Sequence, residues 1–232
     1  MPAAWPVWGK FVEFCKVLRD YIGAGGRNRN ARVRDIHALS EFLASRASHV
    51  AQTSLYGYLR TRAGTRFPEL FTHEQFAKSI DIAKWAVWLA CLSDLAIYAG
   101  GLVLHRSGAG QAEVGRLMSE AVDGILTATG TPEGAGSDFA DLAQRVKTRV
   151  ALCDWAAVRD DATPFAESPG ALISQAPIID DLKRLDDEIV RNSVRFRWQE
   201  VRRELRRDLD AQVLMASIEQ GNPTARAGEG DS

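Results

Sequence analysis

The sequence has few of the residues from which common chemical motifs are built. Its 232 residues include three cysteines, Cys15, Cys91 and Cys153, which stand far apart and form no Cys-x-x-Cys pair. This usage excludes a disulfide framework and a cysteine-based zinc site, and it is typical of a reducing compartment. The first residues have neither the apolar core nor the cleavage site of a secretory signal, so we expect a cytoplasmic protein.

The motifs of several enzyme classes are also missing. The sequence has no His-Glu-x-x-His, no Gly-x-Ser-x-Gly and no phosphate-binding glycine loop of either common type. Helical bundles that hold paired metal ions use Glu-x-x-His motifs, and none occurs here. His37 and Glu41 are four residues apart on a predicted helix, but two ligands do not make a site. We therefore predict neither a metal ion nor a cofactor.

The sequence also lacks an excess of charge of one sign. Its formal net charge is −1, which gives no overall attraction to nucleic acid or to anionic lipid. Residues 1–71 hold 11 Lys and Arg against 5 Asp and Glu, whereas residues 111–176 hold 5 against 10. This asymmetry fits either attraction within the molecule or a surface for an acidic partner. The arginines of residues 191–207 alternate with acidic residues, so we expect no nucleic-acid binding.

One long apolar run stands out against this background. The residues from Trp85 to Leu104 are almost all apolar, and Asp94 is the strongly polar exception. A helix that is apolar all round is buried in a large core or spans a bilayer. A carboxylate near the middle of a membrane span costs roughly 2.5–3.5 kcal/mol on insertion scales, so a protein core is favoured over a membrane. The run therefore predicts a central helix over residues 73–104.

Apolar residues spaced three or four apart predict further helices over residues 7–22, 31–62, 111–127, 137–153 and 178–218. Asn30, Thr72 with Gln75, and Ser137 are the expected N-terminal caps. Three prolines between residues 160 and 177 argue against a helix there. We predict an all-α fold, a bundle of about six helices around residues 73–104 with a long C-terminal helix. Residues 1–221 are expected to form a single domain, and residues 222–232 a disordered tail.

Asp94 is the most informative polar residue, because a buried carboxylate must be paired, hydrogen-bonded or protonated. If helices 31–62 and 73–104 form an antiparallel hairpin, Arg46 comes within reach of Asp94, and we expect that contact or a hydrogen bond from Ser45. A polar pocket between these two helices would bind a ligand through Arg46, Tyr56 and Asp94. Asp94 and His49 are the candidate catalytic groups of such a pocket.

The last predicted helix is too long for the domain. About 40 residues make a helix of roughly 60 Å, whereas a compact chain of this length has a diameter near ~45 Å. The helix must bend or break, or else leave an apolar edge exposed, formed by Trp198, Val201, Leu205, Leu209 and Val213. We expect that edge to pair with a second copy in a homodimer. A break near Asn192 and Ser193, which folds both halves onto the body, is the alternative.

These patterns favour a non-catalytic helical scaffold, adaptor or assembly factor that acts through protein–protein contacts, as a homodimer or with another protein. The first alternative is a small-ligand-binding protein or enzyme that uses the pocket of Arg46, Tyr56 and Asp94. The further alternative is a peripheral membrane protein, through residues 7–22 or the central apolar run. The sequence does not identify a partner, a ligand, a reaction or a pathway.

Overall fold

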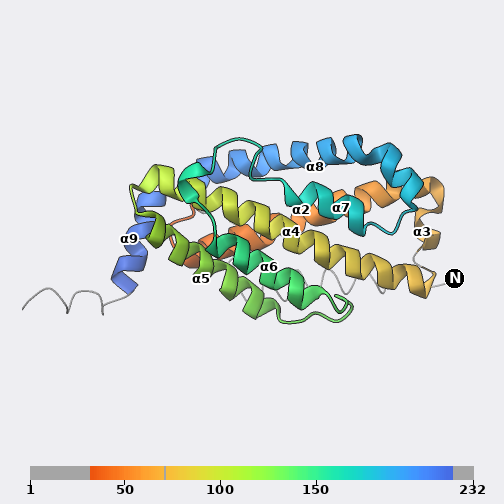
Figure 1. Cartoon of the computed structure of the whole chain (residues 1–232), viewed down its shortest axis with the longest axis horizontal. Coiled ribbons are helices and arrows are strands. Elements are labelled where there is room, and N and C mark those ends of the chain that lie inside the picture. Colours follow the sequence, from red (N-terminus) through yellow and green to blue (C-terminus); the bar gives the residue numbers. More distant parts are fainter. Residues whose placement is uncertain (1–31, 71, 222–232) are drawn as a thin grey trace, which may run out of the picture.

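The computed structural model describes residues 32–70 and 72–221, which form helices packed on helices around one apolar core (Figure 1). This confirms the predicted all-α bundle. The predicted helix over residues 7–22 and the predicted tail over residues 222–232 lie outside the described residues. The α-helices in chain order are α2 (Ile36–Ala63), α3 (Phe67–Leu70), α4 (Glu74–Ser107), α5 (Gln111–Thr129), α6 (Phe139–Ala151), α7 (Glu167–Gln175), α8 (Asp180–Asp208) and α9 (Ala211–Gly221).

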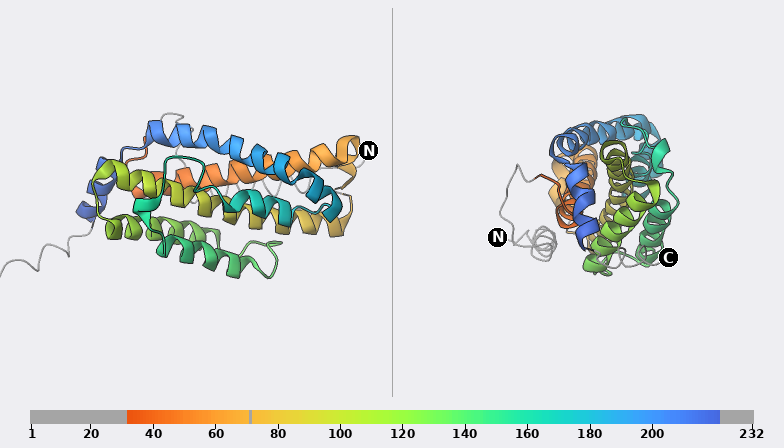
Figure 2. Two further views of the ribbon diagram at one scale, coloured as in Figure 1. Left: turned by 45° about the horizontal axis from the view of Figure 1, so that its top comes forward. Right: turned by 90° about the vertical axis from the view of Figure 1, so that its left-hand side faces the viewer.

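The apolar helix α4 lies at the centre of the bundle, as predicted. Helices α2, α5, α6, α7 and α9 pack directly on it, while α8 packs on α2 and α7 along one edge of the molecule (Figures 1 and 2). α4 is long and apolar enough to cross a membrane, but 94% of its most apolar stretch is buried by the other helices. The apolar surface of α4, which lipid would contact in a membrane span, thus packs against the apolar stripes of the surrounding helices.

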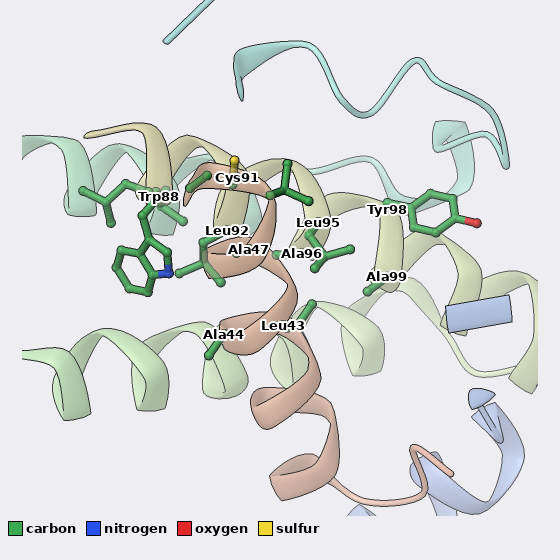
Figure 3. Close-up of a cluster of buried hydrophobic side chains, with 14 of the residues drawn as sticks. Leu43, Ala44, Ala47, Trp88, Cys91, Leu92, Leu95, Ala96, Tyr98 and Ala99 are labelled. Atoms are coloured by element: carbon green, nitrogen blue, oxygen red, sulfur yellow. The ribbon is translucent and has the colours of Figure 1, made fainter. Parts of the chain in front are cut away.

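Small residues allow α2 to pack closely on α4. Figure 3 shows Ala47 of α2 beside Leu92 and Ala96 of α4, and all three side chains are fully buried. Alanine has little side-chain volume, so two backbones can approach while the leucines fill the space between them. This contact is the most extensive between any two of the described helices.

Helix α2 begins later than predicted. α2 starts at Ile36 and not at residue 31, because the carboxylate of Asp35 caps it by accepting a hydrogen bond from the amide of Ala38 at 2.8 Å. Upstream of this cap, Val33 is extended and pairs with Leu209. The chain therefore cannot be helical from residue 31 onward.

The expected cap Asn30 lies outside the described residues, and the other two predicted caps, Thr72 and Ser137, are wrong. The hydroxyl of Thr72 donates to the carbonyl of Glu69 in the preceding turn and does not cap α4, whose N-cap is His73. The N-cap of α6 is Asp138, and the Ser137 hydroxyl only donates to the Asp138 carboxylate. In both places the helix begins one residue later than the predicted cap requires, so the hydroxyl lies outside the capping position.

The prediction of no helix between residues 160 and 177 is wrong as well, because α7 forms over Glu167–Gln175. Pro169 is the third residue of this helix. Backbone N–H groups in the first turn have no acceptor within their own helix, so a proline there removes no hydrogen bond. The prolines therefore mark the start of α7 and do not prevent it.

The last predicted helix is broken, but not near Asn192. α8 is continuous from Asp180 to Asp208, and the chain turns at Leu209 before α9 begins. The amide of Val33 donates to the carbonyl of Asp208 at 2.8 Å, and its carbonyl accepts from the amide of Asp210 at 3.0 Å. The peptide groups freed at the break are thereby hydrogen-bonded to the segment before α2.

This break places the predicted dimer edge inside the molecule. Trp198, Val201, Leu205 and Leu209 are buried against the chain's own core, and only Val213 of that edge is exposed. The expectation of an exposed edge formed by these residues is therefore wrong. α8 is roughly 43 Å long at 1.5 Å per residue, which matches the length of the bundle it packs on.

Two glycines in α4 make room for the segment between α6 and α7. A Cβ atom at Gly100 would lie 2.2 Å from Cζ3 of Trp155, and one at Gly101 would lie 2.4 Å from Cγ1 of Val158. Both distances are far shorter than a van der Waals contact. The two glycines are therefore a packing requirement that lets this segment lie directly on the central helix.

We predict that Gly100→Ala destabilises the protein by about 1–3 kcal/mol, the usual effect of overpacking a core. The matched control is Gly124→Ala on α5, where a Cβ atom would meet nothing within 4 Å. The control should gain up to ~1 kcal/mol, because alanine has the higher helix propensity. Urea unfolding of the three proteins measures both effects, and equal or greater stability of Gly100→Ala would contradict the packing described above.

Candidate functional site

Asp94 is fully buried in the middle of α4, and its carboxylate contacts the start of another helix. Its Oδ2 accepts from the amide of Ser168 at 2.8 Å, and its Oδ1 accepts from the amide of Glu167 at 3.2 Å. These amides belong to the first turn of α7, whose own N-cap, Ala166, offers no side-chain acceptor. A carboxylate there also interacts favourably with the helix dipole. Asp94 therefore takes the place of the missing cap.

Arg149 of α6 completes this arrangement, which we call the Asp94 cluster. Its Nη1 donates to Asp94 Oδ1 at 2.7 Å and to the Ser93 hydroxyl at 2.9 Å, and its Nη2 donates to the carbonyl of Pro164 at 3.0 Å. On the other side, the hydroxyl of Ser168 accepts from Nε1 of Trp198 in α8 at 3.0 Å. The cluster joins α4, α6, α7 and α8 through one network.

The chemistry of this network is that of a structural contact. Burial raises the pKa of Asp94 above its ordinary value, although the Arg149 guanidinium and the amide and hydroxyl of Ser168 oppose that rise. Burial likewise raises the pKa of Cys91, so its thiol stays protonated and is a poor nucleophile. Every polar contact found for the Asp94 carboxylate is to the chain itself.

The structure separates the residues predicted to share a pocket. The predicted contact of Arg46 with Asp94 is wrong: Arg46 Nε donates to Glu204 of α8 at 2.5 Å. Ser45 is exposed and donates to a carbonyl of its own helix. The physical reason is that α6 and α7, and not α2, cover the side of α4 from which Asp94 projects.

His49 and Tyr56, the other two residues predicted for this pocket, lie elsewhere on α2. His49 is exposed on α2. Tyr56 is half-buried, and its burial, with the nearby Asp81 carboxylate, raises its pKa to about 12. The ligand-binding role of Arg46, Tyr56 and Asp94 and the catalytic role of Asp94 and His49 stay predictions. No contact described here brings the four side chains together.

A second polar cluster fastens the segment between α6 and α7 onto α8. Asp160 Oδ1 accepts from the Tyr98 hydroxyl at 2.7 Å and from Arg206 Nη1 at 2.9 Å, and the Asp160 carbonyl accepts from Arg202 Nη2 at 2.7 Å. Partial burial acts to raise the pKa of Asp160, but these hydrogen bonds outweigh burial and lower the pKa. The cluster is half-exposed and acts as a clamp between segments.

Two further observations bear on whether the chain holds a ligand or a metal ion. An open hollow of about 740 Å³ lies on the outer face of α5, and its lining comes entirely from that one helix: Arg116, Ser119, Glu120, Asp123, Gly124, Thr127 and Ala128. It is a facet of a helix surface and not a space enclosed between helices. Within residues 32–70 and 72–221, no group of three His, Cys, Asp or Glu side chains is placed to hold a metal ion.

The outward face of α8 carries a row of exposed apolar side chains. Leu185, Ile189 and Phe196 are exposed to 76%, 72% and 69%. Spacings of four and seven residues place them on one line along the helix. We call these three residues the outer stripe. They lie opposite the buried stripe, which contains Val194 and Trp198.

The sequence does contain a signal for this second stripe. On spacing alone, Leu185 and Ile189 continue one apolar line with Leu182, and the skip from Ile189 to Val194 interrupts it near Asn192. A shift of five residues moves the position by about 140° around a helix, because each residue turns it by 100°. The skip therefore marks a change from one face of α8 to the other.

Polar contacts to α2 fix the rotation of α8 and so keep the outer stripe outward. The carboxylate of Asp186 accepts from the Tyr58 hydroxyl at 2.9 Å and from the guanidinium of Arg62. The hydrogen bonds from Arg62 are the main reason that the pKa of Asp186 is lowered. Arg46 and Glu204 form a further contact between α2 and α8, five turns along α8.

We predict that Asp94→Ala lowers the free energy of unfolding by about 3–5 kcal/mol, because it removes the buried partner of the partly buried Arg149 guanidinium and leaves the first amides of α7 without their acceptor. The control is Asp123→Ala on α5, which removes an exposed ion pair with Lys147 and should cost less than ~1 kcal/mol. Urea unfolding compares the two variants. An Asp94→Ala protein as stable as the parent would show that the network does not support the fold.

The contacts of Asp186 should also make stability depend on pH. Folding lowers its pKa below the value of about 3.9 for an unfolded chain, so the contacts stabilise fully above about pH 4. Their contribution is lost as the pH falls through the folded-state pKa. The parent should therefore be more stable than Asp186→Asn at about pH 6, and the difference should shrink on acidification. A difference that stays constant down to about pH 2 would contradict this assignment.

Comparison of the chain with protein-family models, with curated proteins and with solved structures finds no match. The function has to be inferred from the described residues themselves.

Proposed function

We propose that the protein is a non-catalytic helical scaffold or adaptor that binds a protein partner through the outward face of α8. The observation that carries this proposal is the outer stripe, three large apolar side chains that are each more than two-thirds exposed. Single apolar residues on a surface are ordinary, but a row of them on one face marks an interaction site.

The position of the stripe supports this role. α8 is continuous for 29 residues, and its inner side is attached to α2 through Asp186 and Glu204. A helix held in this way presents its outer side chains with little loss of freedom on binding, which lowers the entropic cost of association. Charged residues such as Glu188 and Arg195 flank the stripe and would form the polar rim of an interface.

The polar groups of the core support the non-catalytic part of the proposal. The Asp94 carboxylate is surrounded by donors from its own chain, and the Cys91 thiol is buried with a raised pKa. A catalytic carboxylate or thiol needs a face that a substrate can reach. These groups instead hold four helices together.

We further propose that the protein acts in the cytoplasm and away from the bilayer. The three dispersed cysteines fit a reducing compartment, and Cys91 is buried as a thiol. The apolar surface of α4 is already covered by its neighbours. A peripheral membrane role through residues 7–22 concerns residues outside the described part and has no support from the helices described here.

Site-specific photo-crosslinking in living cells tests the proposed function. A photoreactive residue replaces Phe196 in the outer stripe, and a control chain carries it at Asp123 on α5. We expect protein crosslinks from position 196 well above those from position 123, and their loss when Ile189→Glu is added. Equal yields at the two positions would contradict the proposed role of α8.

A further inference from the structure

The charges beside the outer stripe reverse sign about the middle of α8. Glu188 lies four residues before Asn192 and Arg195 lies three after it; Asp181 lies eleven residues before and Arg203 eleven after. All five side chains are exposed. Asp181, Asn192 and Arg203 lie within about 60° of the stripe, whereas Glu188 and Arg195 flank one side of it, each about 100° from the stripe residue that follows it. The charges beside the stripe are therefore acidic in the N-terminal half of α8 and mainly basic in the C-terminal half, where Glu200 is the exposed acidic exception.

We infer that the partner of the outer stripe is a second copy of this chain, whose α8 lies antiparallel to the first across a two-fold axis at Asn192. This inference rests on the proposed function of α8. In such a pair, positions that are equally far before and after Asn192, to within one residue, face one another. Glu188 then meets Arg195 of the second copy, Asp181 meets Arg203, and each contact occurs twice.

The apolar residues satisfy the same register. Ile189 lies three residues before Asn192 and Phe196 four after it, so the two side chains meet across the axis and meet again at the symmetric position. Both belong to the outer stripe, and packing them together removes their exposed apolar surface from water, which favours association. One register therefore pairs the apolar residues and the charges at once, which a chance row of exposed residues would not do.

The opposite arrangement is unfavourable. If the two α8 helices ran parallel, Glu188 would lie beside Glu188 and Arg195 beside Arg195. Like charges at that separation repel, and they exclude wrong arrangements more effectively than they add affinity. Asp181 already pairs with Arg184 of its own helix, so the Glu188–Arg195 contact is the one that discriminates between the two arrangements.

The contact is of modest size. From Asp181 to Arg203 the facing helices run for roughly 33 Å at 1.5 Å per residue. A surface made mainly by one helix on each side is at the small end of specific interfaces, so we expect a reversible dimer whose population rises with concentration.

Charge exchange tests the register in the full-length protein by sedimentation velocity over a range of concentrations. The parent should form a dimer, and Glu188→Arg or Arg195→Glu should each weaken it by at least tenfold, because each creates two like-charge contacts. The double variant, which exchanges the two charges, should recover dimerisation. Urea unfolding of the same variants confirms that these exposed changes leave the fold intact. A double variant as weak as the single ones would overturn the proposed register.

Disulfide trapping tests the position of the axis. In a chain that also carries Cys15→Ser and Cys153→Ser, Asn192→Cys should form a covalent dimer on oxidation. Gln199→Cys is the control, because its two copies would lie roughly 21 Å apart, 14 residues at 1.5 Å each. Equal trapping at both positions would overturn the inference.

The crosslink at position 196 distinguishes failure of the dimer from failure of the proposed function. A crosslink between two copies of the chain supports both. A monomer at all concentrations whose position 196 crosslinks to a different protein overturns the dimer and leaves the proposed function standing. A crosslink to residues 1–31 of the same chain, or no crosslink above the control, overturns both.

Discussion

The burial of one carboxylate organises this fold. A charge in a protein core costs several kcal/mol unless donors surround it, and Asp94 lies at the middle of the most buried helix. Its donors come from Arg149 of α6 and from the first turn of α7, while Ser168 in that turn also binds Trp198 of α8. Satisfying one side chain therefore fixes the relative positions of four helices. α7 has only nine residues, too few to be stable alone, and it depends on this contact for its N-terminal cap.

The proposed interaction surface is a consequence of the same constraint. Trp198 is placed by its hydrogen bond to Ser168, and Asp186 by its contacts to Tyr58 and Arg62 of α2. Together these contacts set the rotation of α8 about its own axis. With that rotation fixed, Leu185, Ile189 and Phe196 have to face outward. The interior thus decides which of the two apolar faces of α8 is available to a partner.

The predictions that failed concern helix starts and side-chain contacts, which the local sequence does not specify. Thr72 and Ser137 are residue types that cap helices, but α4 and α6 each begin one residue later than those caps require, and Asp35 caps α2. Arg46 was paired with Asp94 because the two helices adjoin in sequence and do pack together. Adjacency does not say which side of α4 faces α2, and Asp94 projects from another side. The prediction that helices α2 and α4 pack together is therefore correct, but the predicted partner of Asp94 is wrong.

The class of fold and the central helix follow from the amino-acid sequence, because hydrophobic periodicity and the composition of a twenty-residue apolar run are local properties. The need of Asp94 for a partner follows in the same way. The identity of that partner, Arg149, and the choice of which apolar stripe of α8 faces the core come from the packing of the folded chain. Both depend on contacts between residues about 30 to 130 positions apart, such as Ser168 with Trp198 and Tyr58 with Asp186, and no local pattern records them.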